Sequence, residues 1–151
     1  MTREQLTAFV TEKLPDVKQG TNKQYPEFIT TADKIHDFAR ELKLNPETRM
    51  DYLFCETAAD RKDGLHVVYF VNSTAHGHSA ILRVILPDKA NPVVPTVSDV
   101  WRAAEFHERE MFDLFGIRFE NHPNLTRIFL DDDWVGHPLR KDYKDAFTIE
   151  R

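Results

Sequence analysis

The sequence predicts an α+β fold, in which an antiparallel meander sheet carries helices on one face and an extended C-terminal strap follows. Three observations support this fold class. Capping signals stand before apolar stripes at helical spacing. Three runs rich in β-branched and aromatic residues follow one another across short loops. Residues 116–151 are apolar but have no sustained helical or strand period. We therefore expect an α+β domain over residues 1–115 and the strap over residues 116–151.

A chain of 151 residues with 41% hydrophobic and 30% charged residues is expected to form one main domain with a buried core. The formal net charge of -5 offers no domain-wide basic field, so we expect no nucleic-acid partner. Cys55 is the only cysteine, which excludes an internal disulfide framework and a multi-cysteine zinc or iron–sulfur site. We expect Cys55 to be a small buried hydrophobe in a reducing cytoplasm.

The apolar runs are also too short to cross a bilayer, which takes ~20 residues. The N-terminal segment lacks the apolar core of a signal peptide. We therefore expect any association with a membrane to come through a partner.

Two amphipathic helices are expected near the N-terminus. Thr2 and Gln5 form a capping-box pattern before the first, which Pro15 ends, and Thr30 and Asp33 give the same signal before the second. The apolar faces consist of Leu6, Phe9, Val10 and Leu14 in the first helix and of Ile35, Phe38, Ala39 and Leu42 in the second. Between the helices, residues 16–28 predict one or two short strands around a turn.

The middle of the chain predicts the sheet. Strand-like runs cover residues 50–57, 65–72 and 79–86, and the loops between them are short enough for hairpins. Residues 87–95 contain three prolines and are expected to form a loop. Thr96 and Asp99 then predict the start of a third helix, which Gly116 ends as a C-cap.

Glu108 lies in the middle of the apolar stripe of this third helix. The stripe consists of Trp101, Ala104, Glu108, Met111 and Phe115. A buried carboxylate without a partner costs several kcal/mol, so Glu108 is expected either to hold a proton or to meet an arginine. We expect Arg127 or Arg140 of the strap to be that arginine.

The flank of the same helix carries Glu105, Arg109 and Asp113 at a spacing of four residues, which predicts successive ion pairs, with Glu105 on a solvated face. Phe106 and Leu114 point away from the apolar stripe. The helix is therefore expected to be covered on both sides, by the sheet on one and by the strap or another protein on the other.

A metal-dependent hydrolase is an alternative of another class, and it would use His107, Glu108, His122 and His137. The segment around His107 lacks the second histidine of the HExxH zinc motif. His122 and His137 each precede a proline and are expected to orient backbone by hydrogen bonding. The histidines at positions 76 and 78 lie in a predicted turn, where exposure to solvent is expected more often than metal binding.

Two segments, EREMFDLFGIRFENHPNLTRI and DDDWVGHPLRKDY, together resemble the signature of the 30 kDa subunit, also called the C subunit, of the proton-pumping NADH:quinone oxidoreductase known as respiratory complex I. The resemblance covers residues 101–143. It implies a noncatalytic structural subunit in the hydrophilic arm of an enzyme of the translocase class. It implies no catalytic residue, cofactor or metal in this chain, within a complex that carries iron–sulfur clusters, quinone and possibly FMN and NADH.

The resemblance also implies partners and a location. The chain is expected to pack against the quinone-site D subunit and near the cluster-bearing B subunit, on the cytoplasmic side of the cell membrane as a peripheral protein. The expected partner interface follows the motif positions: Glu108, Arg109, Glu110, Asp113, Leu114, Phe115, Gly116, His122, Pro123, Arg127, Gly136, His137, Pro138, Leu139, Arg140, Lys141, Asp142 and Tyr143.

Charged residues of this set are expected to fix the path of the strap, while its apolar residues supply buried area. We expect the cations Arg109, Arg127, Arg140 and Lys141 to pair with carboxylates such as Glu110, Asp113 and Asp142. Membrane-bound energy-converting hydrogenases and oxidoreductases that use ferredoxin or coenzyme F420 have similar subunits, so the electron donor stays open. A free-standing adaptor is a third alternative.

Overall fold

The first helix begins at its predicted capping box in the computed structural model, which describes residues 1–149. The Thr2 hydroxyl accepts a hydrogen bond from the N–H of Gln5, and the Gln5 side chain accepts one from the N–H of Thr2. The helix α1 then runs over Arg3–Lys13 and buries Leu6 and Val10. This element is confirmed as the sequence predicts it.

The second helix is confirmed, but its predicted cap is wrong. Thr30 is the last residue of strand β2 and is buried, so its hydroxyl is not at the helix end. A 3-10 turn, η1 (Ala32–Lys34), leads from the strand into α2 (Ile35–Leu44). The predicted apolar stripe of α2 is buried throughout.

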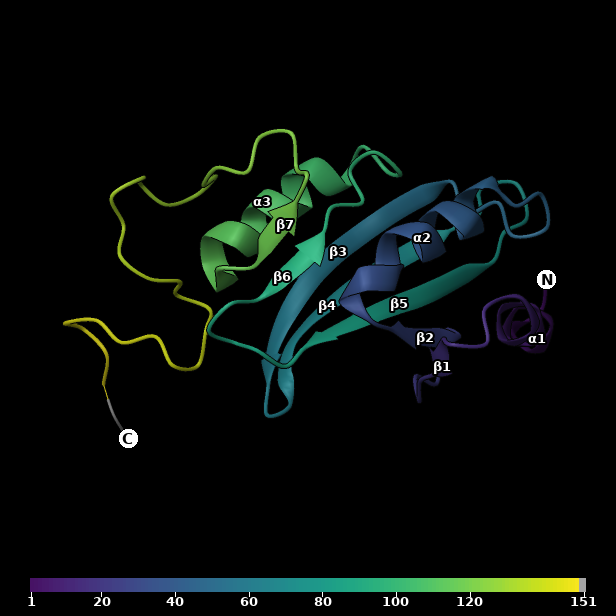
Figure 1. The fold of residues 1–151 in the computed structure, drawn as a ribbon, viewed down its shortest axis with the longest axis horizontal. Helices are drawn as coiled ribbons and strands as arrows, with labels where there is room; N and C mark the ends of the chain where they lie inside the picture. Colours follow the sequence, from purple (N-terminus) through teal and green to yellow (C-terminus); the bar gives the residue numbers. More distant parts are fainter. Residues whose placement is uncertain (150–151) are drawn as a thin grey trace.

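The predicted meander forms one side of the larger sheet, with β3 at the edge (Figure 1). Among residues 1–149 the sheet has five strands in the order β1-β2-β5-β4-β3. Their bounds are Lys18–Gln19, Glu27–Thr30, Tyr52–Arg61, Gly64–Asn72 and Ser79–Leu86 for β1 to β5. The pairs β3–β4 and β4–β5 are antiparallel, as expected. The strand β2, however, joins β5 in parallel, which the long connection through α2 and the β3–β4 hairpin permits.

One face of this sheet and the helices form the core. In β4 and β5 the core residues alternate along each strand, as expected for a sheet that is covered on one side. Buried residues of α1, α2 and α3 (Ala104–Phe115) join the same apolar cluster. In Figure 1, α2 lies across β4 and β5. The expectation of helices packed on one face of a largely antiparallel sheet is therefore confirmed.

A second, two-stranded sheet was not expected from the sequence. It pairs β6 (Val93–Pro95) in parallel with β7 (Arg118–Glu120), the first strand of the strap. The segment predicted as a loop therefore ends in a strand, and Phe119 of β7 is buried in the core. The prediction that Thr96 starts the third helix is also wrong, because Ala103 is the N-cap residue of α3.

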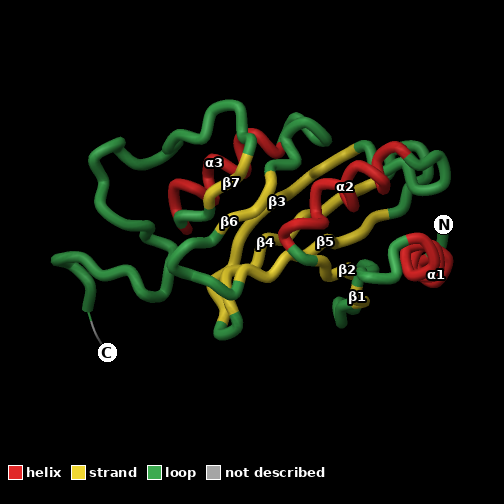
Figure 2. Tube along the Cα trace, viewed as in Figure 1, coloured by secondary structure: helices red, strands yellow, loops and turns green. Residues whose placement is uncertain are grey.

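After β7 the chain has no further helix or strand up to residue 149, and Figure 2 shows it as one continuous loop around α3. We call residues 121–149 the distal strap. None of the helices between residues 1 and 149 has the length and apolar character needed to cross a bilayer.

Candidate functional site

The candidate site is the surface that the distal strap forms on α3. The helix ends at Gly116, whose backbone has the left-handed φ of 73° that glycine tolerates best. A Cβ atom at this position would lie 2.6 Å from Cδ2 of the His137 ring, so the turn also needs the space that glycine leaves. The C-cap role predicted for Gly116 is confirmed, and it lets the strap return along the helix.

Asp113 is the main attachment point for the strap. Its side chain is fully buried, and one carboxylate oxygen accepts hydrogen bonds from the N–H groups of Ile128, Phe129 and Leu130 at 2.8–3.2 Å. The other oxygen lies 2.9 Å from the guanidinium of Arg127. Burial raises the pKa of Asp113, but the hydrogen bonds from the strap and from Arg127 outweigh burial and hold this pKa below its ordinary value.

Arg127 connects two passes of the strap. Besides Asp113, its guanidinium donates to the carbonyl oxygens of Trp134 and Gly136, at 2.9 and 3.2 Å. Planar guanidinium groups suit such converging acceptors, because their five N–H donors point in fixed directions. Arg127 therefore fixes the loop between residues 127 and 136 on the end of α3.

Further hydrogen bonds follow the strap along the helix. Arg109 donates to the carbonyl oxygens of residues 126 and 127, and His122 lies 2.9 Å from the carbonyl oxygen of residue 105. The ring of His137 lies 2.9 Å from the carbonyl oxygen of Asp113, as expected for a histidine that orients backbone. Arg140 pairs with Asp142 at 2.9 Å and reaches the carbonyl oxygen of residue 115.

The apolar side chains of the distal strap are left outside these contacts. Phe129 is 66% exposed, Leu139 is 52% exposed and Val135 is 88% exposed. The remaining large apolar side chains of this segment that are exposed are Ile128, Trp134, Phe147 and Ile149. Single exposed hydrophobic residues are ordinary, but a group of this size on one segment marks an interaction surface.

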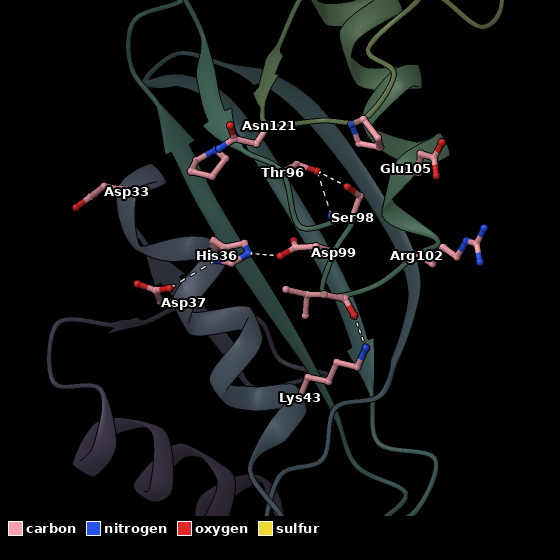
Figure 3. A pocket seen from close by; sticks show the side chains of 13 residues that line it. Asp33, His36, Asp37, Lys43, Thr96, Ser98, Asp99, Arg102, Glu105 and Asn121 are labelled. Carbon is pink, nitrogen blue, oxygen red and sulfur yellow. Dashed lines mark hydrogen bonds and ion pairs between the residues drawn. The ribbon is translucent and has the colours of Figure 1, made fainter.

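A polar cleft of about 860 Å³ lies elsewhere, between α2 and the turn that precedes α3 (Figure 3). His36 of α2 and Asp99 of the turn face one another across it, with a separation of 2.8 Å between ring nitrogen and carboxylate. The hydrogen bond that the His36 ring donates to Asp99 raises the pKa of His36. Each of these two side chains is the hydrogen-bond partner of the other. The cleft is therefore a polar contact between α2 and the turn that precedes α3.

Residues 28–147 match the model of the family described as the 30 kDa subunit of respiratory-chain NADH dehydrogenase. The chain belongs to this family. The match extends well beyond residues 101–143, on which the sequence resemblance rested, and it confirms that resemblance.

Two relatives differ in how much of their own length matches this chain. The NADH-quinone oxidoreductase C subunit of Acidothermus cellulolyticus is 53% identical over 137 residues, which cover 87% of this chain and 71% of the relative. The NADH-quinone oxidoreductase C/D subunit of Phocaeicola vulgatus is 43% identical over 118 residues, which cover 78% of this chain. The match spans only 22% of the length of that C/D protein.

A solved structure shares the fold. A chain in the structure of the membrane-bound sulfane sulfur reductase, an archaeal respiratory membrane complex, superposes with a TM-score of 0.79 at 31% identity. The superposition covers 93% of this chain and 85% of that chain. A fold with this family's architecture therefore occurs in a respiratory complex that is named for sulfur reduction.

The family's motif positions fall into two groups in the structure. Most of them either form α3 or bond to it through the strap, as described above. Tyr143 packs against Gly136, where an added Cβ atom would lie 3.0 Å from the tyrosine ring. Lys141 bonds through its backbone N–H to the carboxylate of Asp60, at 2.8 Å, while its side chain is exposed. Glu110 is a half-buried residue of α3, and Pro123 is an exposed residue of the distal strap.

The pairs Arg127–Asp113 and Arg140–Asp142 are among the pairings expected for the strap, but the predicted partner of Glu108 is wrong. Glu108 is fully buried as expected, but Arg127 and Arg140 bind other carboxylates. Its carboxylate instead accepts hydrogen bonds from the N–H of Val97, at 2.8 Å, and from the hydroxyl of Thr96. The ion pair predicted between Asp113 and Arg109 along the helix is also wrong, since Asp113 is buried under the strap and pairs with Arg127.

The histidines also differ from the prediction in part. His78 is buried and lies 2.7 Å from the carbonyl oxygen of Thr48, and its ring stacks on that of His76. Burial lowers the pKa of His78. Within residues 1–149, no group of three or more His, Cys, Asp or Glu side chains could hold a metal ion. The hydrolase alternative therefore has no metal centre in this part of the chain. Cys55 is partly exposed, in contrast to the expected full burial.

One attachment point of the strap was not predicted. Asp60, at the end of β3, binds Lys89 at 2.5 Å as well as the strap, and its position in a charged hairpin gave no signal of this role. Phe129 lies between the two segments of the family motif, and Val135 lies within the second. Their signal was present, because they are apolar residues in a segment that cannot bury them by itself.

Proposed function

We propose that this protein is a noncatalytic structural subunit of the hydrophilic arm of a complex I-type NADH:quinone oxidoreductase. In this role it supports electron transfer to quinone that is coupled to proton translocation. The chain itself contributes no catalytic residue and holds no iron–sulfur cluster, flavin or quinone. Its partners are the quinone-site D subunit and the cluster-bearing B subunit, and it meets the cytoplasmic side of the membrane only through them.

The exposed apolar surface of the distal strap carries this proposal. The strap backbone is already bonded to α3, so its conformation is largely set before a partner arrives. Binding then loses little conformational freedom, while side chains such as Phe129 and Val135 still have apolar area to bury. A preformed surface of this kind suits a permanent interface between subunits, which commonly buries more than ~2,000 Å² in total.

The C/D relatives support the quinone-site D subunit as the partner. In the relative from Phocaeicola vulgatus, as its name states, the C and D subunits form one protein. A covalent link keeps two parts at a high effective concentration, and it persists only where their geometry allows both to function together. The proposal extends this adjacency to the separate chain.

The experiment that tests the proposal places charges on the strap surface. We expect the double variant Val135→Asp and Leu139→Asp to fold normally, because both side chains are exposed. We expect its affinity-tagged form to recover at least about tenfold less of the other oxidoreductase subunits from native membranes, because a desolvated charge at an interface is strongly unfavourable.

The matched control is Leu44→Asp, which changes another exposed leucine, at the end of α2 and outside the strap. We expect this control to recover the partner subunits at the wild-type level. Recovery of subunits at the wild-type level by the strap variant would contradict the proposed interface.

A second candidate is the equivalent subunit of a membrane complex with another electron donor or acceptor. The fold shared with a chain of the sulfane sulfur reductase complex favours it specifically. The same affinity purification separates the two candidates. An NADH-binding flavoprotein among the recovered subunits supports the first, and a hydrogenase-like large subunit without that flavoprotein supports the second.

A further inference from the structure

Two buried polar groups face one another in the sheet below α3. Glu56 of β3 and Tyr69 of β4 are directly opposite in the antiparallel pair and point to the core side. Glu56 is only 3% exposed, and neither of its carboxylate oxygens has a hydrogen-bond partner in the described structure. The hydroxyl of Tyr69 is equally buried and equally without a partner there. An ionised carboxylate is rarely left in such surroundings, because nothing replaces its hydration.

Glu108 of α3 adds a second buried carboxylate to this region. Val97 and Thr96 donate hydrogen bonds to it, and Nε2 of His122 lies 3.7 Å away. Among residues 1–149, no lysine or arginine pairs with Glu56 or Glu108. The other titratable groups that face the two carboxylates are Tyr69, Cys55 and Asp99, which add no positive charge.

His122 does not supply the missing positive charge in this arrangement. Its Nδ1 accepts a hydrogen bond from the N–H of Asn124 at 3.0 Å, so Nδ1 carries no proton. Its Nε2 lies 2.9 Å from the carbonyl oxygen of Glu105, which only an N–H can satisfy. The ring is therefore neutral, with its proton on Nε2.

We propose that Glu56, Tyr69 and Glu108 form a buried proton-binding site, in which protons on Glu56 and Glu108 keep α3 packed on the sheet. A neutral Glu56 needs no counter-ion. The residue opposite it, Tyr69, is also polar and uncharged. A protonated Glu108 donates to the Thr96 hydroxyl, which can in turn donate to the Ser98 hydroxyl 2.8 Å away.

The directions of the pKa shifts of Glu56 and Glu108 agree with this geometry. Burial raises the pKa of Glu56 well above its ordinary value, and the nearby Glu108 raises it further. Burial also raises the pKa of Glu108 to about 7, against the opposing effect of its hydrogen bonds from Thr96 and Val97. The proton on Glu108 is therefore exchanged near neutral pH.

The site also lies beneath the attachment of the strap. The strap is bonded to α3 through Asp113 and Arg109 and to the sheet through Asp60, so movement of α3 against the sheet disturbs these bonds. Loss of the buried protons is thus linked to a weaker seating of the surface that we propose for the partner. The proton site itself does not depend on that proposal, because it rests on the core alone.

The test measures urea unfolding of the full chain between about pH 5 and pH 8, for the wild type, Glu56→Gln and Glu56→Leu. The folded state keeps protons that the unfolded state loses above its ordinary pKa of 4.5, so stability is lost as the pH rises toward the folded pKa. We expect the wild-type folding equilibrium constant to fall up to about tenfold per pH unit for each such group. Both Glu56 variants remove one group and should reduce this slope.

The control is Glu27→Gln, which also changes a buried glutamate but one paired with Arg83 at 2.5 Å. We expect it to lower stability across the range while keeping the wild-type slope. Equal slopes for the wild type and both Glu56 variants would overturn the proposal.

Infrared spectroscopy of the folded wild type gives a second readout that needs no unfolding. We expect the carbonyl band of a protonated carboxylic acid at pH 6, and we expect Glu56→Gln to lack part of it. Absence of that band in the wild type would also overturn the proposal.

Hydrogen exchange of the amides of Ile128 to Leu130 tests the link to the strap. Their protection, relative to amides of β4, should fall with rising pH, and a constant ratio would disprove the link.

Discussion

The helix-and-sheet body and the distal strap are ordered by opposite means. In the body, apolar side chains such as Val67 and Leu82 are fully buried, and polar groups are mainly backbone atoms paired in the sheet. In the distal strap the polar atoms point inward, to Asp113 and neighbouring carbonyl oxygens, and apolar side chains such as Val135 point outward. The strap is therefore held by hydrogen bonds and ion pairs, while its apolar area stays available.

This difference has an energetic consequence. Hydrogen bonds contribute only ~0.5 to 1.5 kcal/mol each, whereas burial of a large apolar side chain contributes ~1.5 to 3 kcal/mol. A segment that is held by hydrogen bonds without burial of apolar side chains has low local stability, and it opens before the body does. The order of the strap depends on a few anchors, and each of them can be removed separately.

The largest expected effect is that of Arg127→Ala. The substitution leaves the buried carboxylate of Asp113 without its counter-ion, and the loss of one partner of a buried pair costs ~3 to 5 kcal/mol. We expect the strap to detach from α3, so the amides of Ile128, Phe129 and Leu130 should lose their protection in hydrogen exchange. The amides of β4 should stay protected, because the body keeps its core.

The control for this variant is Arg118→Ala, which removes an exposed arginine of β7. We expect no change in exchange at residues 128–130. If Arg127→Ala leaves that protection intact as well, the strap is held mainly by something other than the pair with Asp113.

The contrast between body and strap also explains what the sequence could predict. Periodicity locates α1, α2 and the meander because each buries one face, as in the stripe that contains Phe38 and Leu42. The strap has no period, yet its apolar, aperiodic composition was enough to predict an extended segment on a surface. Gly116 as a C-cap follows from local backbone chemistry alone.

The remaining features depend on contacts between distant residues, which no local pattern contains. The partner of Asp113 could be chosen only after the strap had been folded back on α3, and the hydrogen bonds of Glu108 only after Thr96 was known to lie outside the helix. The parallel pairs β2–β5 and β6–β7 likewise join segments that are far apart in the chain. Short strands such as β6 are too brief to show alternation.

The next largest effect is expected where the strap turns back. Gly116→Ala forces a Cβ atom into a left-handed backbone and against the ring of His137, 2.6 Å away. We expect a loss of ~2 to 4 kcal/mol, measured by urea unfolding, as the sum of backbone strain and a displaced strap. Gly77→Ala is the matched control, with a similar φ of 69° but nothing within 4 Å of the added atom.

We expect the control to lose only ~1 kcal/mol, which is the cost of the backbone conformation by itself. Equal losses in the two variants would show that the contact between Gly116 and His137 does not restrain the strap.

Acid should separate the strap from the body. The folded pKa of Asp113 lies below its ordinary value of 3.8, so its contribution is present above that value and is lost as the pH falls through the folded pKa. The pKa values of Glu56 and Glu108 are raised, so a fall in pH does not remove their contribution to stability. We expect the strap to detach before the body unfolds.

Tryptophan fluorescence measures this separation, since Trp134 lies in the strap and Trp101 in the core. In the variant Trp101→Phe, the remaining signal should change at a higher pH than the far-ultraviolet circular dichroism does. Coincident transitions would contradict separate opening of the strap.

The smallest effect on the isolated chain is expected for Arg140→Ala. The sequence suggested a buried ion pair here, but the Asp142 carboxylate that pairs with Arg140 is 66% exposed. Such pairs contribute only ~0 to 1 kcal/mol, so urea unfolding of the variant should resemble that of the wild type. The effect on assembly should be larger, because a partner that covers the strap would remove water from the Arg140–Asp142 pair. We therefore expect reduced recovery of partner subunits with Arg140→Ala despite normal folding. A fully assembled but inactive complex would instead assign Arg140 a role in the reaction.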